Sequence, residues 1–408
     1  MSGYPDRRLR VLLVGTEFFR GHGGIQNINR LLVRAFCRMG IRTPLALDVF
    51  SFTDGPEHIP ATFPSVQGGE QQAELHWHAA RRSRAALSWQ LGRRVAAERP
   101  DLVLFTHVAL LPLGRLVRSL APGVRLAALA HGTEVWGPLA RRVTGVLSLV
   151  DAFVSPSEYT ARKLAEVHCV SSARIQVLPH GLDPNWAAEC GATVGSKTTS
   201  LEGRILLSVT RLSRADTAGK GVELVLHALP AVLARFPDAR YVIAGGGGDL
   251  RRLQESVGRL GLESCVQFLG SCGPDALARA YSSADVFVLP TQVEGFGVVF
   301  LEAMFHRLPV VAVRASATPE VVEDAETGML IPPGDSRELS AALAALLSDE
   351  DRRRALGEAG RRRVERMYTF DHFAARWERW IAGQVPEAIY AARQGGCFSL
   401  ARAAAGAA

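Results

Sequence analysis

The sequence lacks the features of several large protein classes. No apolar run approaches the about 18–20 residues that a membrane-spanning helix needs, because the longest candidate, 102–113, is interrupted by Thr106 and His107. The six cysteines are scattered and none forms a C-x-x-C pair, which argues against both a zinc site and a disulfide framework. Residues 1–10 are polar and lead directly into a strand-like run, so we expect no signal peptide and a reducing, cytoplasmic location.

Two common ligand-binding motifs are incomplete, and a third occurs in an unsuitable place. A dinucleotide fingerprint fails because Leu250 stands where the third glycine after Gly245 and Gly247 belongs. A phosphate-binding G-x4-G-K-[ST] loop fails because Gly221 follows Lys220 and Arg214 replaces the first glycine. The single D-x-D, at 349–351, is typical of a helix start. We therefore expect no dedicated metal site and no bound cofactor.

The composition is that of an ordinary globular protein. The chain has 408 residues, of which 48% are hydrophobic and 21% charged, enough for two or three domains with their own cores. Residues 1–190 carry 22 Lys and Arg against 15 Asp and Glu, which accounts for the whole formal net charge of +7. This asymmetry favours an anionic partner for the N-terminal half, such as a membrane surface or a phosphate-bearing acceptor. The alternative is a solvated basic surface without a partner.

Short apolar runs alternate with helical patterns along the chain, which predicts an α/β fold of doubly wound sheets. The alternation weakens between Pro184 and Gly203 and then restarts. We expect two Rossmann-like domains, at 1–190 and 191–385, facing a cleft that holds the ligand, followed by a poorly ordered tail at 386–408. Residues 75–99 are predicted to form one helix that carries Trp77, Trp89 and several arginines, and an aromatic, basic helix suits an anionic bilayer. The alternative is a helix that packs its tryptophans inward.

The strongest chemical signal runs from Asp285 to Val313. A predicted strand ends at Leu289, Glu294 and a Gly-Phe-Gly turn follow, and a predicted helix then carries Glu302. The glycines allow a ligand to approach the backbone, and the helix start offers free N–H groups. Two carboxylates eight residues apart suit different parts of one polyhydroxylated ligand. As a lone pair they would more often be ordinary surface residues.

This stretch resembles the E-x7-E motif of retaining nucleotide-sugar glycosyltransferases of family 4, which have the GT-B architecture. Other elements of that family recur in order over about residues 10–382: Gly23-Gly24, His131-Gly132-Thr133-Glu134, Val154–Ser157, Pro179–Asp183, Arg211 with Lys220-Gly221, Val242–Gly247, Phe268–Gly270, Thr318–Glu320 and Thr327-Gly328. One departure is His306-Arg307, where relatives usually have cysteine or glycine before Leu-Pro, and Arg307 is expected either to complement the helix dipole or to alter donor choice.

The resemblance implies a role for each matching residue. Four residues are implied to be catalytic, with the two cations stabilising the leaving diphosphate: His131, Glu294, Arg211 and Lys220. The others are implied to bind the donor, with Glu302 on its ribose: Gly23, Gly24, Gly270, Gly295, Phe296, Gly297 and Glu302. The implied activity is transfer of a hexose-type sugar from a UDP- or GDP-sugar to a saccharide, lipid-linked or small-molecule acceptor by a front-face mechanism without metal. Two alternatives stay open, a nucleotide-sugar epimerase and a non-catalytic sugar-nucleotide-binding protein.

Overall fold

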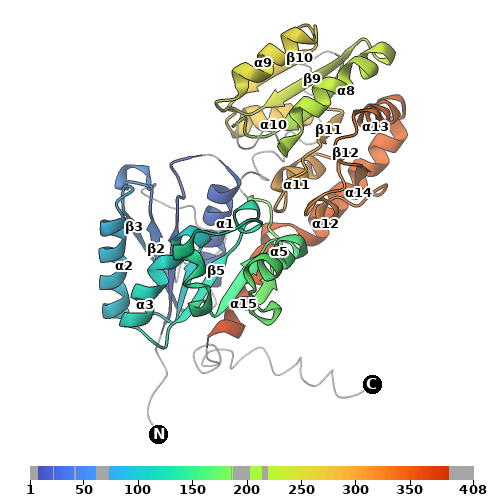
Figure 1. Cartoon of the computed structure of the whole chain (residues 1–408). Helices are drawn as coiled ribbons and strands as arrows, with labels where there is room; N and C mark the ends of the chain where they lie inside the picture. Colours follow the sequence, from blue (N-terminus) through green and yellow to red (C-terminus); the bar gives the residue numbers. More distant parts are fainter. Residues whose placement is uncertain are drawn as a thin grey trace, which may run out of the picture. The chain divides into compact units, whose positions relative to one another are not determined.

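The computed structural model describes residues 8–21, 23–40, 43–60, 73–184, 186, 203–213 and 219–385 (Figure 1). These residues fall into two compact units. Unit 1 holds the described residues up to Pro156, then Ala161–Leu178 and those from Asp371 onward. Unit 2 holds Ser157–Thr160 and Pro179–Phe370. The units therefore cross the boundaries expected from the sequence, since the last helix returns to unit 1, and the tail at 386–408 lies outside the described residues.

The described part of unit 1 contains a seven-stranded parallel sheet in the order β3-β2-β1-β4-β5-β6-β7. Its strands are β1 (Leu9–Gly15), β2 (Leu45–Ser51), β3 (Ala73–Ala79), β4 (Leu102–Phe105), β5 (Arg125–Leu129), β6 (Ala152–Ser155) and β7 (Ile175–Val177). Its helices are α1 (Gly24–Met39), α2 (Arg84–Glu98), α3 (Gly114–Leu120), α4 (Arg141–Thr144), α5 (Glu158–His168, whose first turn belongs to unit 2) and α15 (Phe370–Gln384), with 3₁₀ turns η1 (Pro56–His58), η2 (Val108–Leu113), η3 (Thr133–Val135), η4 (Leu147–Leu149) and η5 (Ser172–Arg174).

The described part of unit 2 contains a six-stranded parallel sheet in the order β10-β9-β8-β11-β12-β13. Its strands are β8 (Arg204–Val209), β9 (Ala239–Ala244), β10 (Val266–Gly270), β11 (Val286–Leu289), β12 (Val310–Val313) and β13 (Gly328–Ile331). Its helices are α8 (Val222–Arg235), α9 (Leu250–Arg259), α10 (Pro274–Ser283), α11 (Val298–Phe305), α12 (Thr318–Val321), α13 (Ser336–Ser348) and α14 (Glu350–Met367). The prediction of two Rossmann-like α/β domains is confirmed.

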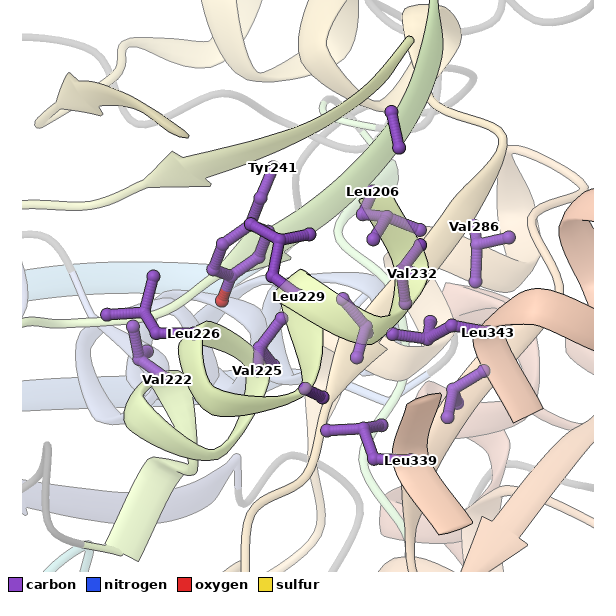
Figure 2. Close-up of a cluster of buried hydrophobic side chains, with 14 of the residues drawn as sticks. Leu206, Val222, Val225, Leu226, Leu229, Val232, Tyr241, Val286, Leu339 and Leu343 are labelled. Atoms are coloured by element: carbon purple, nitrogen blue, oxygen red, sulfur yellow. The ribbon is translucent and has the colours of Figure 1, made fainter. Parts of the chain in front are cut away.

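Both faces of the unit 2 sheet are buried, as the continuous apolar strands require. Along β8, Leu206 joins one core, whereas Ile205 and Leu207 point to the other. The first core packs α8 and α13 against the sheet, and Figure 2 shows Leu339 and Leu343 of α13 beside the buried face of α8. The second core contains α10 and α11, so the helix that carries Glu302 is anchored by apolar packing.

Helix α14 approaches the end of α11 closely because two of its residues are glycines. A Cβ on Gly357 would lie 2.0 Å from the Arg307 carbonyl oxygen, and one on Gly360 would lie 2.9 Å from Met304. Arg307 itself has a φ of 59° and forms a 2.8 Å ion pair with Glu358 of α14. This contact gives Arg307 a structural role in joining the two helices.

The predicted helix over 75–99 is wrong in its first part. Residues 73–79 form β3, the edge strand beside β2, and the helix begins only at Arg84. The alternation of Leu75, Trp77 and Ala79 with polar residues is the two-residue period of a strand. Trp77 packs against Phe18 with a ring-centroid distance of 5.5 Å, whereas Trp89 on α2 is 66% exposed. The two tryptophans therefore belong to different elements with different surroundings.

Candidate functional site

Three candidate residues of unit 2 lie in the loops where the strand order of its sheet reverses. Strands β8 and β11 are neighbours, with Leu206 opposite Val286, and the chain proceeds from β8 toward β9 and from β11 toward β12 in opposite directions. In parallel sheets the loops at the carboxyl ends of two such strands separate and leave room for a ligand. Arg211 and Lys220 follow β8, and Glu294 follows β11.

An ion pair joins the two loops. The Lys220 ammonium lies 2.6 Å from Glu294 Oε2, and the two side chains are only 20% and 15% exposed. The Gln292 N–H also donates to the Gly219 carbonyl, at 2.9 Å. A half-buried charge is costly without a partner, so each side chain favours the other in this arrangement. Lys220 is thereby held at the start of α8 and Glu294 at the approach to α11.

The loop after β12 fixes the backbone of Glu294. Its N–H donates to Ser316 Oγ at 3.0 Å, and its carbonyl accepts from the Ala317 N–H at 3.2 Å. Ser316 has a φ of 49°, a left-handed conformation that positions its hydroxyl toward the motif. These supports come from residues outside the E-x7-E motif, and no sequence signal pointed to them.

In the Gly-Phe-Gly turn, the backbone lies at the start of α11, whereas the Phe296 side chain is buried. Gly297 caps α11 with a φ of 89°, and a Cβ there would lie 2.4 Å from the Phe300 ring. The Gly295 carbonyl accepts from Ser157 Oγ at 2.8 Å. Phe296 is 4% exposed and its ring meets that of His180 edge-on. The side chain of Phe296 is thus part of the core, and its backbone amide is the group available to a ligand at the helix start.

Glu302 lies on α11 and is buried among apolar side chains of the second core. Burial raises the pKa of its carboxyl to about 7, although a hydrogen bond from the Tyr281 hydroxyl acts to lower it. That hydroxyl donates to Glu302 Oε2 at 2.8 Å. A buried carboxylate with acceptor capacity left can bind hydroxyl groups of a ligand.

Arg211 is exposed and follows β8 in a loop that the neighbouring strand supports. The Leu212 N–H donates to the Gly246 carbonyl, and Gly245 and Gly247 lie so close to this loop that a Cβ on either would collide with its backbone. Gly270, with a φ of 69°, ends β10 and accepts from the Gly245 N–H at 2.8 Å. Part of the segment between Arg211 and Lys220, residues 214–218, lies outside the described range.

The candidate residues of unit 1 lie at the carboxyl ends of its own strands. His131 follows β5, and its Nε2 lies 2.7 Å from the Thr106 carbonyl, so this nitrogen carries the proton. Burial lowers the pKa of His131 against the opposing charge of Glu134, which keeps the ring neutral near pH 7. Glu134 also accepts the backbone N–H of His131.

Gly23 and Gly24 come at the end of the loop after β1. Gly24 opens α1, and a Cβ there would have no described atom within 4 Å. Sequence reasoning missed the residue that shapes this loop. The fully buried Asp54 carboxylate accepts the N–H groups of Phe18 and Arg20, each at 2.7 Å, and the Ser51 hydroxyl at 2.6 Å. The only signal is the Asp-Gly turn after β2.

Two family models match the chain over most of its length. The model described as "Glycosyltransferase Family 4" matches residues 22–186, and the one described as "Glycosyl transferases group 1" matches residues 195–363. The candidate residues Gly23, Gly24 and His131 fall within the first match, and those from Arg211 to Glu302 within the second.

Curated relatives match most of the chain. It is 29% identical to the GDP-mannose-dependent alpha-(1-6)-phosphatidylinositol monomannoside mannosyltransferase of Mycobacterium tuberculosis, over 92% of this chain and 98% of that one. It is 32% identical to the enzyme of the same name from Mycolicibacterium smegmatis, over 61% of this chain and 67% of that one.

Solved structures share the fold. Sucrose-phosphate synthase from Thermosynechococcus elongatus superposes with a TM-score of 0.72 at 21% identity, over 92% of this chain and 99% of that one. HepE from Anabaena, solved with UDP and glucose, superposes with a TM-score of 0.71 at 18% identity, over 92% and 100%. At these identities the likeness concerns the arrangement of the elements.

The close approach of the two site loops makes Gly221 sensitive to substitution. Gly221 has a φ of 75°, and a Cβ there would lie 2.3 Å from the Pro290 carbonyl oxygen. Gly261 has a similar φ of 67° with nothing within 4 Å, which makes it a matched control. We predict that Gly261→Ala costs about 1 kcal/mol of unfolding free energy through backbone strain. Gly221→Ala should cost about 1–3 kcal/mol more because of the collision. Urea unfolding followed by circular dichroism measures both, and equal losses would contradict the prediction.

Proposed function

We propose that this chain, which belongs to the family 4 glycosyltransferases with the GT-B architecture, transfers a hexose-type sugar from a nucleoside-diphosphate sugar to an acceptor hydroxyl with retention of anomeric configuration. The observation that carries the proposal is the Lys220–Glu294 pair at the β8–β11 reversal, with the buried Glu302 on the helix that follows. It supplies a cation for a diphosphate beside carboxylates for sugar and ribose hydroxyls.

In the proposed reaction, Lys220 and Arg211 neutralise the charge that develops on the leaving diphosphate. The bond between the anomeric carbon and the diphosphate oxygen breaks, and the acceptor oxygen bonds to that carbon on the same face. The acceptor proton passes to the departing phosphate oxygen. Lys220 then shares its charge between Glu294 and the phosphate, because its side chain already lies within 2.6 Å of that carboxylate.

Glu294 and the amides of Gly295 to Gly297 are assigned to the transferred sugar, and Glu302 to the donor ribose. Gly23 and Gly24 open α1, whose first N–H groups suit a phosphate. His131 is assigned to the sugar near the reacting carbon. Because its ring is neutral, it contributes hydrogen bonding and no positive charge.

Two features of the relatives guide the choice of substrates. The mycobacterial relatives are named for GDP-mannose and for a phosphatidylinositol mannoside acceptor, and HepE was solved with UDP and glucose. We therefore propose GDP-mannose with a phosphatidylinositol mannoside acceptor as the first pair to test, and UDP-glucose as the comparison donor. Transfer, epimerisation and binding without turnover are separated by nuclear magnetic resonance of the sugar products, which also reports whether the configuration is retained.

Removing either cation should slow transfer strongly. We predict that Lys220→Ala and Arg211→Ala each reduce kcat by at least about 10²-fold, the scale for losing one preorganised charge partner of a leaving group. Arg251→Ala is the control, because this arginine is 90% exposed and pairs only along α9 among the described residues. The assay is release of nucleoside diphosphate with and without acceptor. Near-normal turnover in both site variants would show that the diphosphate binds elsewhere.

Transfer should not require a divalent cation, because Arg211 and Lys220 are proposed to do that ion's electrostatic work. Among the described residues, no group of three or more His, Cys, Asp or Glu side chains is arranged to hold a metal. We predict that the initial rate persists after dialysis against EDTA and does not rise when Mg²⁺ or Mn²⁺ is returned. An absolute requirement for either ion would contradict the assigned roles of the two cations.

We also propose a peripheral contact with anionic membranes through unit 1. Trp89 of α2 is 66% exposed beneath the Arg93 guanidinium, and Leu120 of the adjoining α3 is 42% exposed. Three more exposed arginines lie in the turn before α2 and on its first residue: Arg81, Arg82 and Arg84. Apolar and basic side chains on one exposed helix pair suit a charged bilayer surface. No helix among the described residues is long and apolar enough to cross a membrane.

The membrane contact predicts co-sedimentation with anionic liposomes that weakens as salt rises, with much less binding to neutral liposomes. Replacing Arg81, Arg82 and Arg84 with serine should reduce binding while the circular dichroism spectrum is unchanged. The control removes the same charge from unit 2, by serine at the exposed Arg352, Arg362 and Arg366 of α14. Wild-type protein that ignores anionic liposomes even at low salt would exclude this contact and favour a soluble acceptor.

A further inference from the structure

The hydroxyl of Tyr281 is a hydrogen-bond partner of the Glu302 carboxylate. Tyr281 lies on α10 and is fully buried, and its O–H donates to Glu302 Oε2 at 2.8 Å. Within the described ranges, Oε1 of Glu302 accepts no hydrogen bond. One carboxylate oxygen is therefore held by the protein and the other keeps its full acceptor capacity.

The Tyr281 ring has little freedom to move its hydroxyl. It stacks on the His306 ring at 5.2 Å with an interplanar angle of 11°, and on Phe287 at 5.9 Å. The Trp186 ring meets it edge-on at 6.0 Å. Three aromatic neighbours from different segments thus fix the position from which the hydroxyl reaches Glu302.

We propose that Tyr281 is a positioning residue that orients the Glu302 carboxylate toward the two ribose hydroxyls of the nucleotide donor. This rests on the proposed function, in which Glu302 holds that ribose. Without the tyrosine hydroxyl, the carboxylate can rotate about its own bond, and both oxygens must find new partners when the ribose arrives. The binding geometry is then no longer preorganised.

The hydrogen bond from Tyr281 also lowers the pKa of Glu302 and so favours its ionised form. The ribose hydroxyls donate to the ionised carboxylate, so donor binding should weaken as pH falls below about 7, where Glu302 takes up a proton. His306, at the end of α11, has its pKa lowered to about 4, mainly by burial and also by the charge of Arg361, so it stays neutral around pH 7. Two arginines also face this end of α11: Arg361 donates to the Phe305 carbonyl, and Arg307 pairs with Glu358.

The test compares Tyr281→Phe with the wild type. Phenylalanine keeps the ring stack and removes only the hydroxyl. We expect the donor KM to rise about ten-fold with little change in kcat, since a hydrogen bond to a charged group is lost. The pH midpoint of the donor KM should move upward by about one unit, so the defect should shrink at alkaline pH. Discrimination between GDP and its 2′-deoxy and 3′-deoxy analogues, measured by calorimetry, should fall.

Tyr241→Phe is the matched control. It removes a hydroxyl that is equally buried in unit 2 but bonds Ser208, at 2.8 Å. It should leave the donor KM, its pH midpoint and the ribose discrimination unchanged. If Tyr281→Phe does not fold, Tyr281→His serves as the second variant, because it keeps a ring and an N–H donor and should retain part of the discrimination.

The outcomes separate this proposal from the one it rests on. In one outcome, Tyr281→Phe keeps the wild-type donor KM, pH midpoint and ribose discrimination, while Glu302→Gln alters all three. This outcome would overturn the role of Tyr281 and leave the ribose assignment intact. Unchanged discrimination in Glu302→Gln would overturn the ribose assignment itself. Equal defects in Tyr281→Phe and Tyr241→Phe would show a general loss of packing and would also overturn the positioning role.

Discussion

The Lys220–Glu294 ion pair is the interaction on which the unit 2 site depends. It joins the loops that follow β8 and β11, at the point where their directions part. Two half-buried side chains of opposite charge stabilise each other there, while either alone would carry an uncompensated charge. Two further features support the pair. Ser316 and Ala317 hold the Glu294 backbone, and Gly221, between Lys220 and α8, lets the chain pass close to the Pro290 carbonyl.

Under the proposed function, the same pair keeps the site for a large anion ordered before that anion arrives. The cation is already placed by a carboxylate, so the proposed diphosphate needs only to share it. Glu302, eight residues further along the chain, is placed by a neutral partner, the Tyr281 hydroxyl. The two carboxylates of one motif are thus held by different partners, one by a charged ammonium group and the other by a neutral hydroxyl.

Much of this arrangement was predictable from sequence because it is local. The β11–α11 unit can be predicted from an apolar run, a proline, two glycines and a helical pattern within thirty residues. The failures come from long-range contacts. Residues 73–79 form an edge strand because β2 lies beside them, and a helical reading of 75–99 ignored their two-residue alternation. Likewise, no local pattern shows that α15 returns to unit 1, where Asp371 pairs with Arg38.

Site residues divide in the same way. Lys220, Glu294 and Glu302 stand in recognisable motifs, whereas Asp54, Ser316 and Tyr281 act through partners about twenty or more residues away. Their roles follow only from the atoms they meet.

Gly357 and Gly360 show that a packing constraint and a role in ligand binding can leave the same pattern of sequence invariance. Both face the end of α11, where any side chain would push α14 away from the motif helix. Neither is assigned a contact with donor or acceptor. Selection would nevertheless preserve both glycines as strictly as a ligand-binding residue. Invariance at these two positions among relatives would therefore record the distance between two helices, and a search for active-site residues based on invariance alone would wrongly include them.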